Sequence, residues 1–427
     1  MSIKLRLIVM NFLQFAVWGA YLTSMSRYLG PAGLGAHIGI FYSVQGIVSI
    51  FMPALVGIIA DRWIPAQKLL GMCHLLAAAF MLSAGLYGLN AGEGVSFSVF
   101  FTLYTFSVAF YMPTLALSNS VAYTILERGG MDTVKSFPPI RVFGTIGFIC
   151  TMWLVDILGF QTTAMQFVMS ALIGLLLGGY AFTLPNCPVS TDTRDKTLFQ
   201  ALGLDAFKLF KERKMALFFI FSMLLGVSLQ ITNGFANPFI ASFEADPHYA
   251  NTFGVQHSNI LISLSQISEA LCILLIPFFL KRYGIKNVIL IAMVAWVLRF
   301  GFFGLGNPGS GAWLLILSML VYGVAFDFFN VSGSLFVDKE TPHHIRSSAQ
   351  GMFMLMTNGI GATVGTLGAQ WVVNQFTSWQ EVMVNGEAKS LMIGDWSSVW
   401  FVFAGYALVV TILFAILFKY KHTPEKA

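Results

Sequence analysis

Residues 37–60 read HIGIFYSVQGIVSIFMPALVGIIA, and Asp61, Arg62 and Trp63 follow at once. No Asp, Glu, Lys or Arg interrupts this stretch. A helix that crosses a bilayer needs about 20 consecutive, mostly apolar residues. The stretch therefore predicts a transmembrane helix that ends at the charged pair.

The rest of the chain has the same apolar character. Of its 427 residues, 57% are hydrophobic and only 10% are charged, and the mean hydropathy is +0.76. A soluble domain carries about 25% charged residues. The composition therefore predicts an all-α membrane protein. The net charge of +5 does not indicate a nucleic-acid partner, because the basic residues are spread over short loops.

Twelve apolar stretches are predicted to span the membrane, six on each side of a polar segment. They lie roughly at 8–28, 37–60, 68–90, 95–117, 140–160, 163–184, 215–243, 256–280, 286–305, 312–337, 347–375 and 397–418. We expect an N-terminal six-helix bundle at 1–185, a cytoplasmic linker at 186–214 and a C-terminal six-helix bundle at 215–427.

The two halves contain weakly similar loops at equivalent places. One reads Pro53-Ala-Leu-Val-Gly-Ile-Ile-Ala-Asp-Arg-Trp63, and the other reads Pro277-Phe-Phe-Leu-Lys-Arg-Tyr-Gly-Ile-Lys286. Two pseudo-symmetric six-helix halves are typical of transporters that bind substrate near the midplane. The segment from Gly57 to Arg62 also resembles the Gly-x-x-x-Asp-Arg loop motif of the major facilitator superfamily, although the second copy lacks the aspartate.

The distribution of basic residues predicts the orientation. Of the 24 Lys and Arg residues, Arg27 and Lys389 fall in outer loops, and Arg141 and Arg299 fall at or within spans. The other 20 fall in inner loops or at the termini. Lys and Arg are enriched on the cytoplasmic side of membrane proteins, so we expect both termini in the cytoplasm and an even number of spans.

Several classes of function lack their sequence signals. The chain has no Walker loop, no metal-ligand cluster and no nucleophile elbow. We therefore expect no enzyme, no cofactor and no metal site. The four cysteines, Cys73, Cys150, Cys187 and Cys272, are expected to be free thiols. A single chain of twelve spans can form a complete pathway, so a functional monomer is expected.

Two carboxylates lie deep inside predicted spans. Glu269 lies in the stretch 260–275, and Asp327 lies in the stretch 321–331. A charge at the centre of a membrane helix costs about 2.5–3.5 kcal/mol, and such acids usually mark pathways or proton relays. A neutral carboxyl that only packs helices is the alternative. The hypothesis is that Asp327 or Glu269 couples transport to protons.

Polar and aromatic residues recur at helical spacing around these acids, which places them on shared helix faces. The faces consist of Gln14, Trp18 and Tyr21; Arg141, Thr145 and Phe148; Gln230, Asn233 and Asn237; Gln266 and Glu269; and Tyr322, Phe326, Asp327 and Asn330. Together they indicate a cavity for a solute with hydroxyl groups and a flat ring. Arg141 at the end of its span can instead snorkel to the interface, and Arg299 is left unassigned.

Several longer strings resemble the bacterial nucleoside:proton symporters, the nucleoside permease and xanthosine permease type. They are Phe137-Pro-Pro-Ile-Arg-Val-Phe-Gly-Thr-Ile-Gly-Phe148, Leu202-Gly-Leu-Asp-Ala-Phe207, Leu229-Gln-Ile-Thr-Asn233, Ser265-Gln-Ile-Ser-Glu269, Tyr322-Gly-Val-Ala-Phe-Asp-Phe-Phe-Asn330 and Ser348-Ala-Gln-Gly351. The resemblance implies a major facilitator fold, a bacterial inner-membrane location and proton-driven nucleoside uptake. It also implies a substrate site of Arg141, Thr145, Phe148, Gln230, Asn233, Gln266, Glu269, Tyr322, Phe326 and Asp327.

The residues alone leave other transporters open. A sugar or oligosaccharide:proton symporter of the same fold needs the same hydroxyl-binding groups, so spacing barely separates it from a nucleoside carrier. A multidrug exporter would have a more apolar pocket with fewer paired amides. The sequence does not rank purine nucleosides, pyrimidine nucleosides and xanthosine, nor does it give the proton stoichiometry.

Overall fold

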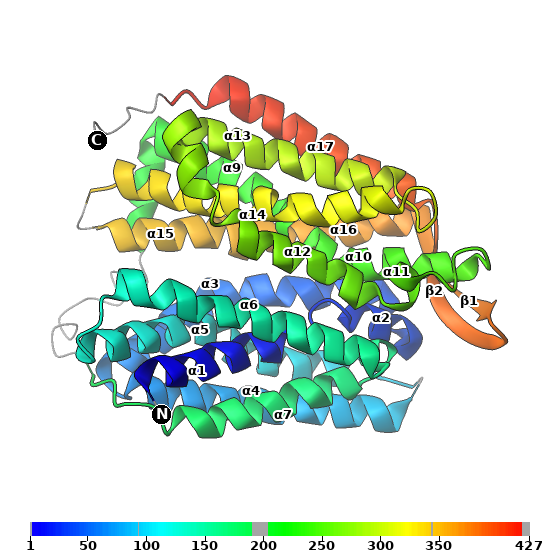
Figure 1. The fold of residues 1–427 in the computed structure, drawn as a ribbon, viewed down its shortest axis with the longest axis horizontal. Coiled ribbons are helices and arrows are strands. Elements are labelled where there is room, and N and C mark those ends of the chain that lie inside the picture. Colours follow the sequence, from blue (N-terminus) through cyan, green and yellow to red (C-terminus); the bar gives the residue numbers. More distant parts are fainter. Residues whose placement is uncertain (1, 93, 190–203, 343–344, 421–427) are drawn as a thin grey trace. The chain divides into compact units, whose positions relative to one another are not determined.

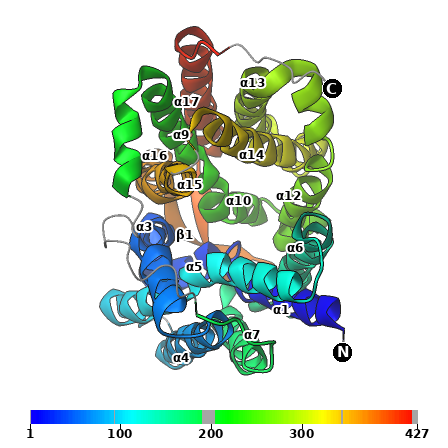
Figure 2. The ribbon, with the colours of Figure 1, turned by 90° about the vertical axis from the view of Figure 1, so that its left-hand side faces the viewer.

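The computed structural model describes residues 2–92, 94–189, 204–342 and 345–420. The chain divides into two units, Met1–Ala201 and Leu202–Ala427, and each is described by itself. Seen along the helices, those of each unit pack side by side as a bundle (Figure 2). Of the predicted linker 186–214, residues 190–203 lie outside the described residues.

The N-terminal unit is entirely helical in its described part (Figure 1). Its longest helices correspond to predicted spans two to five, and short helices join them. The elements are α1 (Ile3–Gly19), α2 (Met25–Leu29), η1 (Gly30–Leu34), η2 (Gly35–His37), α3 (Ile38–Arg62), α4 (Ala66–Ala91), α5 (Phe97–Arg128), α6 (Thr133–Ile157), η3 (Phe160–Thr162) and α7 (Met165–Ala181).

The C-terminal unit contains helices and one pair of strands. Its elements are η4 (Leu204–Lys211), α9 (Arg213–Leu229), α10 (Ile231–Ser242), η5 (Phe243–Ala245), α11 (Phe253–Gln256), α12 (Ser258–Cys272), α13 (Ile276–Leu305), α14 (Ala312–Glu340), α15 (Arg346–Met354), η7 (Leu355–Gly361), α16 (Ala362–Phe376), β1 (Thr377–Val384), β2 (Glu387–Gly394) and α17 (Trp396–Leu417).

Eight helical segments of the described chain are long and apolar enough to cross a membrane. They are Met25–Ala60, Ala66–Ala91, Phe97–Arg128, Lys135–Ile157, Arg213–Ala245, Ile276–Leu305, Ala312–Glu340 and Trp396–Leu417. The other four predicted spans are helical too, but shorter or broken: α1, α7, α12 and the series α15–η7–α16. Every predicted span is therefore helical, and the predicted fold class is confirmed.

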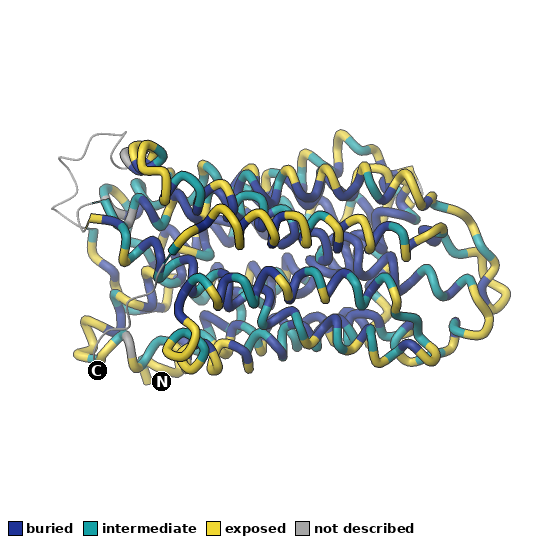
Figure 3. Tube along the Cα trace, turned by 90° about the horizontal axis from the view of Figure 1, so that it is seen from above, coloured by how far each residue is buried: buried dark blue, intermediate teal, exposed yellow. Residues whose placement is uncertain are grey.

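Large apolar side chains remain exposed along these helices, where dark and light segments alternate in Figure 3. Leu176 is 62% exposed, Trp371 67% and Ile416 61%. Patches of this kind are rare on soluble monomers. They are the surface expected of helices that face lipid.

The predicted loops after spans two and eight are largely helical. Helix α3 continues to Arg62, so the first copy forms a helix end. Helix α13 begins at Ile276 and runs through the second copy, with a break at Gly284. That glycine has φ 76°, a left-handed conformation that glycine adopts without steric cost. The prediction of a loop at Pro277–Lys286 is therefore wrong, because the segment is helical on both sides of Gly284.

The connection between α16 and α17 is a β-hairpin rather than an irregular loop. Strand β1 pairs antiparallel with β2 from Thr377↔Gly394 to Val384↔Glu387. The two turn residues, Asn385 and Gly386, have φ of 50° and 87°, as an Asn-Gly turn of this type requires. Lys389 Nζ lies 2.9 Å from Glu244 Oε2, which anchors the hairpin to η5.

Candidate functional site

Helix α6 carries the three predicted site residues of the N-terminal unit. It begins at Thr133, so Arg141 lies two turns inside the helix rather than at its end. The Arg141 guanidinium lies 3.9 Å from the centre of the Phe15 ring on α1. The Phe148 ring packs edge-on against Trp18, also on α1, with 6.3 Å between ring centres. Thr145, between them, is half-buried.

The close approach of α1 and α6 depends on a glycine. A Cβ added at Gly147 would lie 2.2 Å from the Phe12 carbonyl oxygen, so any larger residue would push the helices apart. Glycine lets the helix backbones touch, as small residues do between membrane helices. The contact holds Arg141 and Phe148 against the aromatic side of α1.

The structure corrects the predicted role of two residues of the α1 face. Gln14 is fully buried within the N-terminal unit. Its Oε1 accepts a hydrogen bond from His74 Nε2 at 2.8 Å, and its Nε2 donates to Thr114 Oγ1 at 2.7 Å. Tyr21 is 1% exposed and packs against Tyr104. Of the predicted face Gln14, Trp18 and Tyr21, only Trp18 contacts a predicted site residue in the described chain.

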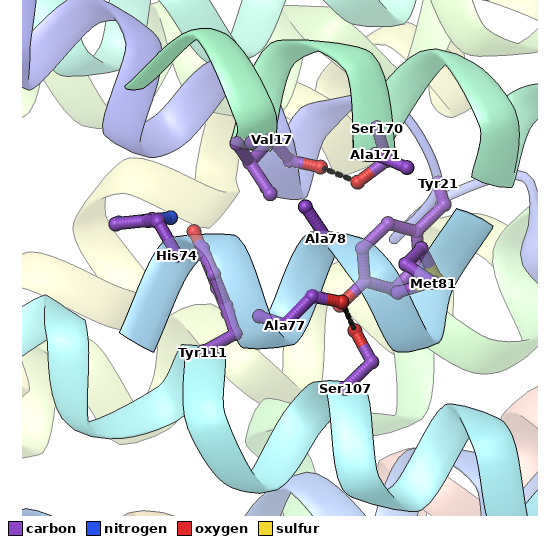
Figure 4. A pocket seen from close by; sticks show the side chains of 11 residues that line it. Val17, Tyr21, His74, Ala77, Ala78, Met81, Ser107, Tyr111, Ser170 and Ala171 are labelled. Carbon is purple, nitrogen blue, oxygen red and sulfur yellow. Dashed lines mark hydrogen bonds between the residues drawn. The ribbon is translucent and has the colours of Figure 1, made fainter. Parts of the chain in front are cut away.

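A small internal cavity lies beside Tyr21 and His74 (Figure 4). Its volume of about 10 Å³ is at the lower limit for one water molecule. The Ser107 and Ser170 hydroxyls at its wall donate to the carbonyls of Ala77 and Val17. The cavity is too small for a nucleoside or a sugar.

In the C-terminal unit, Gln230 and Asn233 lie where two helices meet. Gln230 stands between α9 and α10. Asn233 Nδ2 donates to Gln230 Oε1 at 2.8 Å, and both side chains are half-buried. Asn237, one turn further on, is fully buried and donates to Asn259 Oδ1 at 2.9 Å. Asn237 thus packs α10 against α12, whereas Gln230 and Asn233 retain some exposure.

Helix α14 brings an aromatic pair next to two carboxylates. The Tyr322 and Phe326 rings stack with 5.4 Å between centres and 17° between planes. Glu269 of α12 and Asp327 of α14 both act electrostatically on the Tyr322 hydroxyl. Asp327 is 6% exposed. The structure therefore groups four of the predicted site residues, Glu269, Tyr322, Phe326 and Asp327.

A second glycine contact sets the distance between α12 and α14. A Cβ added at Gly323 would lie 2.5 Å from the Ser268 carbonyl oxygen. The Ser268 hydroxyl also donates to the Leu320 carbonyl. Because Ser268 precedes Glu269 and Gly323 follows Tyr322, this contact fixes the carboxylate relative to the ring.

The sequence left two contributors to this arrangement unassigned. Phe15 packs on Arg141, but an aromatic residue in an apolar helix carries no signal of its own. Arg299 is 2% exposed and lies with its guanidinium 4.5 Å from the centre of the Tyr322 ring. A charge in the middle of an apolar stretch is a signal for function.

Comparison with known proteins identifies the family. The family model described as "Nucleoside H+ symporter" matches residues 1–423. This chain belongs to the nucleoside:proton symporter family. It is 48% identical to the nucleoside permease NupG of Escherichia coli (strain K12) over 425 residues, 99% of this chain and 97% of NupG. It is 47% identical to the xanthosine permease of the same strain over 429 residues, 100% of this chain and 98% of that permease.

Solved structures agree with this assignment. The crystal structure of NupG matches with a TM-score of 0.87 at 47% identity and covers 99% of this chain and 100% of that chain. The inward-open xylose transporter XylE from E. coli matches with a TM-score of 0.67 at 14% identity, over 97% of this chain and 96% of that one. The latter shows the fold alone. The chain is a multi-pass membrane transporter of the major facilitator fold that takes up nucleosides with protons, and it is not an enzyme.

Proposed function

We propose that the nucleoside binds to the ten residues predicted from the sequence, and that Asp327 or Glu269 carries the coupled proton. The observation that carries this proposal is the stacked pair Tyr322 and Phe326 beside both carboxylates. Of the ten residues, the N-terminal unit contributes Arg141, Thr145 and Phe148, and the C-terminal unit contributes Gln230, Asn233, Gln266, Glu269, Tyr322, Phe326 and Asp327.

The chemistry of these residues suits both parts of a nucleoside. The flat base can stack on an aromatic ring, as aromatic pairs do within proteins. The ribose hydroxyls can donate to amide oxygens and accept from amide nitrogens or the Arg141 guanidinium. Gln266 supports this assignment, because its Oε1 is buried and has no hydrogen-bond partner among the described residues. A substrate hydroxyl or N–H would supply one.

The carboxylates suit proton coupling because Asp327 is buried in α14 and Glu269 is half-buried in α12. Protonation of one carboxylate removes a charge and can favour one conformation over another. A ligand shifts such an equilibrium only by its difference in affinity for the two states. Binding of the proton and of the nucleoside to neighbouring groups would couple the two.

The proposal includes the setting of the transporter. The bias of Lys and Arg toward alternate loops supports both termini in the cytoplasm, and the similarity to Escherichia coli permeases supports a bacterial inner membrane. A monomer is proposed as the working unit, since one chain contains two complete helical units.

The test is uptake of radiolabelled uridine into proteoliposomes with an imposed inward proton gradient. We expect accumulation that a protonophore abolishes and that adenosine, but not lactose, competes. Asp327→Asn and Glu269→Gln are then compared. The variant that loses gradient-driven accumulation but still exchanges internal for external uridine identifies the coupling carboxylate. Accumulation against a gradient by both variants would refute the role of these acids.

A further inference from the structure

Arg299 places a charged group inside the C-terminal unit, in the last third of the long helix α13. Its hydrogen bonds in the described chain go to neutral groups: Nη1 donates to the Ser318 carbonyl at 2.7 Å and to Ser265 Oγ at 3.4 Å. Burying a guanidinium is costly unless its surroundings compensate. The position of Arg299 therefore needs a structural or functional explanation.

The compensation comes from aromatic rings. The guanidinium carbon lies 4.5 Å from the centre of the Tyr322 ring and 5.4 Å from that of Phe303. A cation over an aromatic face is attracted by the ring quadrupole, and more strongly when both are desolvated. The attraction is directional, so it restrains the Tyr322 ring as well as the charge.

The same side chain joins three helices at one level. Arg299 of α13 bonds Ser265 of α12 and Ser318 of α14, and the Ser318 hydroxyl donates back to the Arg299 carbonyl at 2.8 Å. Ser318 lies one helical turn before Tyr322, and Ser265 directly precedes Gln266. The bonds of Arg299 therefore tie down the backbone that carries two proposed binding residues.

The charge of Arg299 also has an electrostatic role. The Tyr322 hydroxyl lies within range of Glu269, Arg299 and Asp327. One guanidinium thus faces the same phenol as two carboxylates. Its positive charge offsets their negative charge beside the stacked pair of Tyr322 and Phe326.

We propose that Arg299 is a positioning residue for nucleoside binding, which holds the Tyr322 ring in the orientation that stacks on Phe326. The inference rests on the proposed role of Tyr322 in the substrate site. Arg299 itself acts only through Tyr322. A residue that merely stabilises the fold would affect the amount of folded protein but not the coupling between these two side chains.

The test is a double-mutant cycle on the full-length protein in detergent. Arg299→Lys keeps the positive charge but removes the planar guanidinium. Lysine cannot replace arginine where the guanidinium stacks on a ring. Tyr322→Leu removes the ring. The dissociation constant for uridine is measured for the wild type, both single variants and the double variant, up to millimolar uridine. Adenosine and xanthosine are tested alongside.

Arg299→Lys is expected to raise the dissociation constant about tenfold when Tyr322 is present, the scale of one lost cation–π contact. In the Tyr322→Leu background the same change should have an effect of about twofold or less, because residues that act through one another are not additive. The matched control is Arg282→Lys, whose guanidinium lies 5.7 Å from the Tyr283 ring centre on an exposed part of the chain. It should leave binding unchanged.

Each outcome is decisive. Unchanged uridine binding by folded Arg299→Lys, or an equal loss with and without the Tyr322 ring, would overturn the inference. If Arg299→Lys does not fold, the cycle is repeated with Ser265→Ala, which removes one hydrogen bond of Arg299. A loss of uridine affinity that disappears in the Tyr322→Leu background supports the inference. A loss of affinity that persists in that background overturns it. A wild type that binds no nucleoside would instead refute the proposed site as a whole.

Discussion

Gly323→Ala tests whether the spacing of α12 and α14 controls nucleoside binding. The added Cβ would lie 2.5 Å from the Ser268 carbonyl oxygen and 2.6 Å from its carbon, whereas ordinary contact begins at 3.4 Å. The helices must therefore separate by the difference between 3.4 and 2.5 Å, about 0.9 Å. Neither neighbouring atom can rotate away, because both belong to the backbone.

The expected loss of affinity is similar in size to the expected loss of stability, so the two are measured separately. Overpacking costs about 1–3 kcal/mol, and alanine gains about 1 kcal/mol over glycine in a helix, so the net destabilisation is about 0–2 kcal/mol. Tyr322 and Glu269 flank the contact between Gly323 and Ser268, so the separation of the helices moves Tyr322 away from Glu269. Because displacing a positioned group by about 1 Å can cost up to about 100-fold, we expect the KM for uridine to rise about tenfold.

The assay is uridine uptake by proteoliposomes, with the amount of folded protein determined by gel filtration. The matched control is Gly301→Ala on α13, where an added Cβ meets nothing within 4 Å. The control should be neutral or slightly stabilising, with an unchanged KM. A Gly323→Ala variant that transports with the wild-type KM would refute the argument that this contact positions the site.

Three further predictions concern residues outside the proposed site. His74→Leu leaves the buried Gln14 Oε1 without its imidazole donor. The thermal midpoint should therefore fall by the equivalent of about 1–3 kcal/mol, while the KM for uridine stays within about twofold. A changed KM would place Gln14 in the substrate site. Lys389→Gln removes the ammonium that pairs with Glu244. Chymotrypsin should therefore cut the hairpin faster than in the wild type, and an equal rate would mean that the pair contributes nothing. Burial raises the pKa of the Cys187 thiol to about 11, and the thiolate is the form that reacts. Iodoacetamide should therefore label Cys187 slowly in the folded protein below that pH and rapidly after unfolding. Equal labelling rates would contradict the burial of Cys187.

The sequence predicts the helical fold well because the bilayer itself imposes length and composition on a span. Runs such as residues 37–60 lack charges over the width of a membrane, and the structure has helices there. Interruptions within helices are harder to predict. The π-helix at Leu355–Gly361 contains Asn358, Gly359 and Gly361, which form helix weakly, but that composition does not give the kind of interruption. The break at Gln230 likewise lies inside a stretch that is predicted as one span.

The hairpin carried a sequence signal that helix patterns obscured. Asn385-Gly386 is a typical two-residue hairpin turn, and both residues adopt positive φ. The flanking segments are short and mixed in polarity, and in a chain this apolar they read as an outer loop. The ion pair between Lys389 and Glu244 joins residues far apart in the sequence, which no local pattern predicts.

Helical spacing located the candidate faces but could not separate binding residues from packing residues. Gln14 and Trp18 lie one turn apart on α1, yet Gln14 is bonded to His74 and Thr114 inside the N-terminal unit. Trp18 instead packs beside Phe148. Helical spacing determines which residues share a helix face. The packing of neighbouring helices determines which groups that face contacts.

The hydrogen bonds supply the criterion that spacing lacks. Gln14 and Asn237 are fully buried and bond to polar side chains of neighbouring helices, so each is accounted for by packing within its own unit. Gln266 differs, because its Oε1 is buried and accepts no hydrogen bond from the described residues. Leaving such an acceptor unsatisfied costs about 1–3 kcal/mol. The buried amide oxygens of Asn11, Gln45 and Asn119 also lack a partner among the described residues, so the missing donor favours a binding role for Gln266 only together with its place one turn from Glu269. A bound nucleoside that donates to Gln266 would recover that free energy.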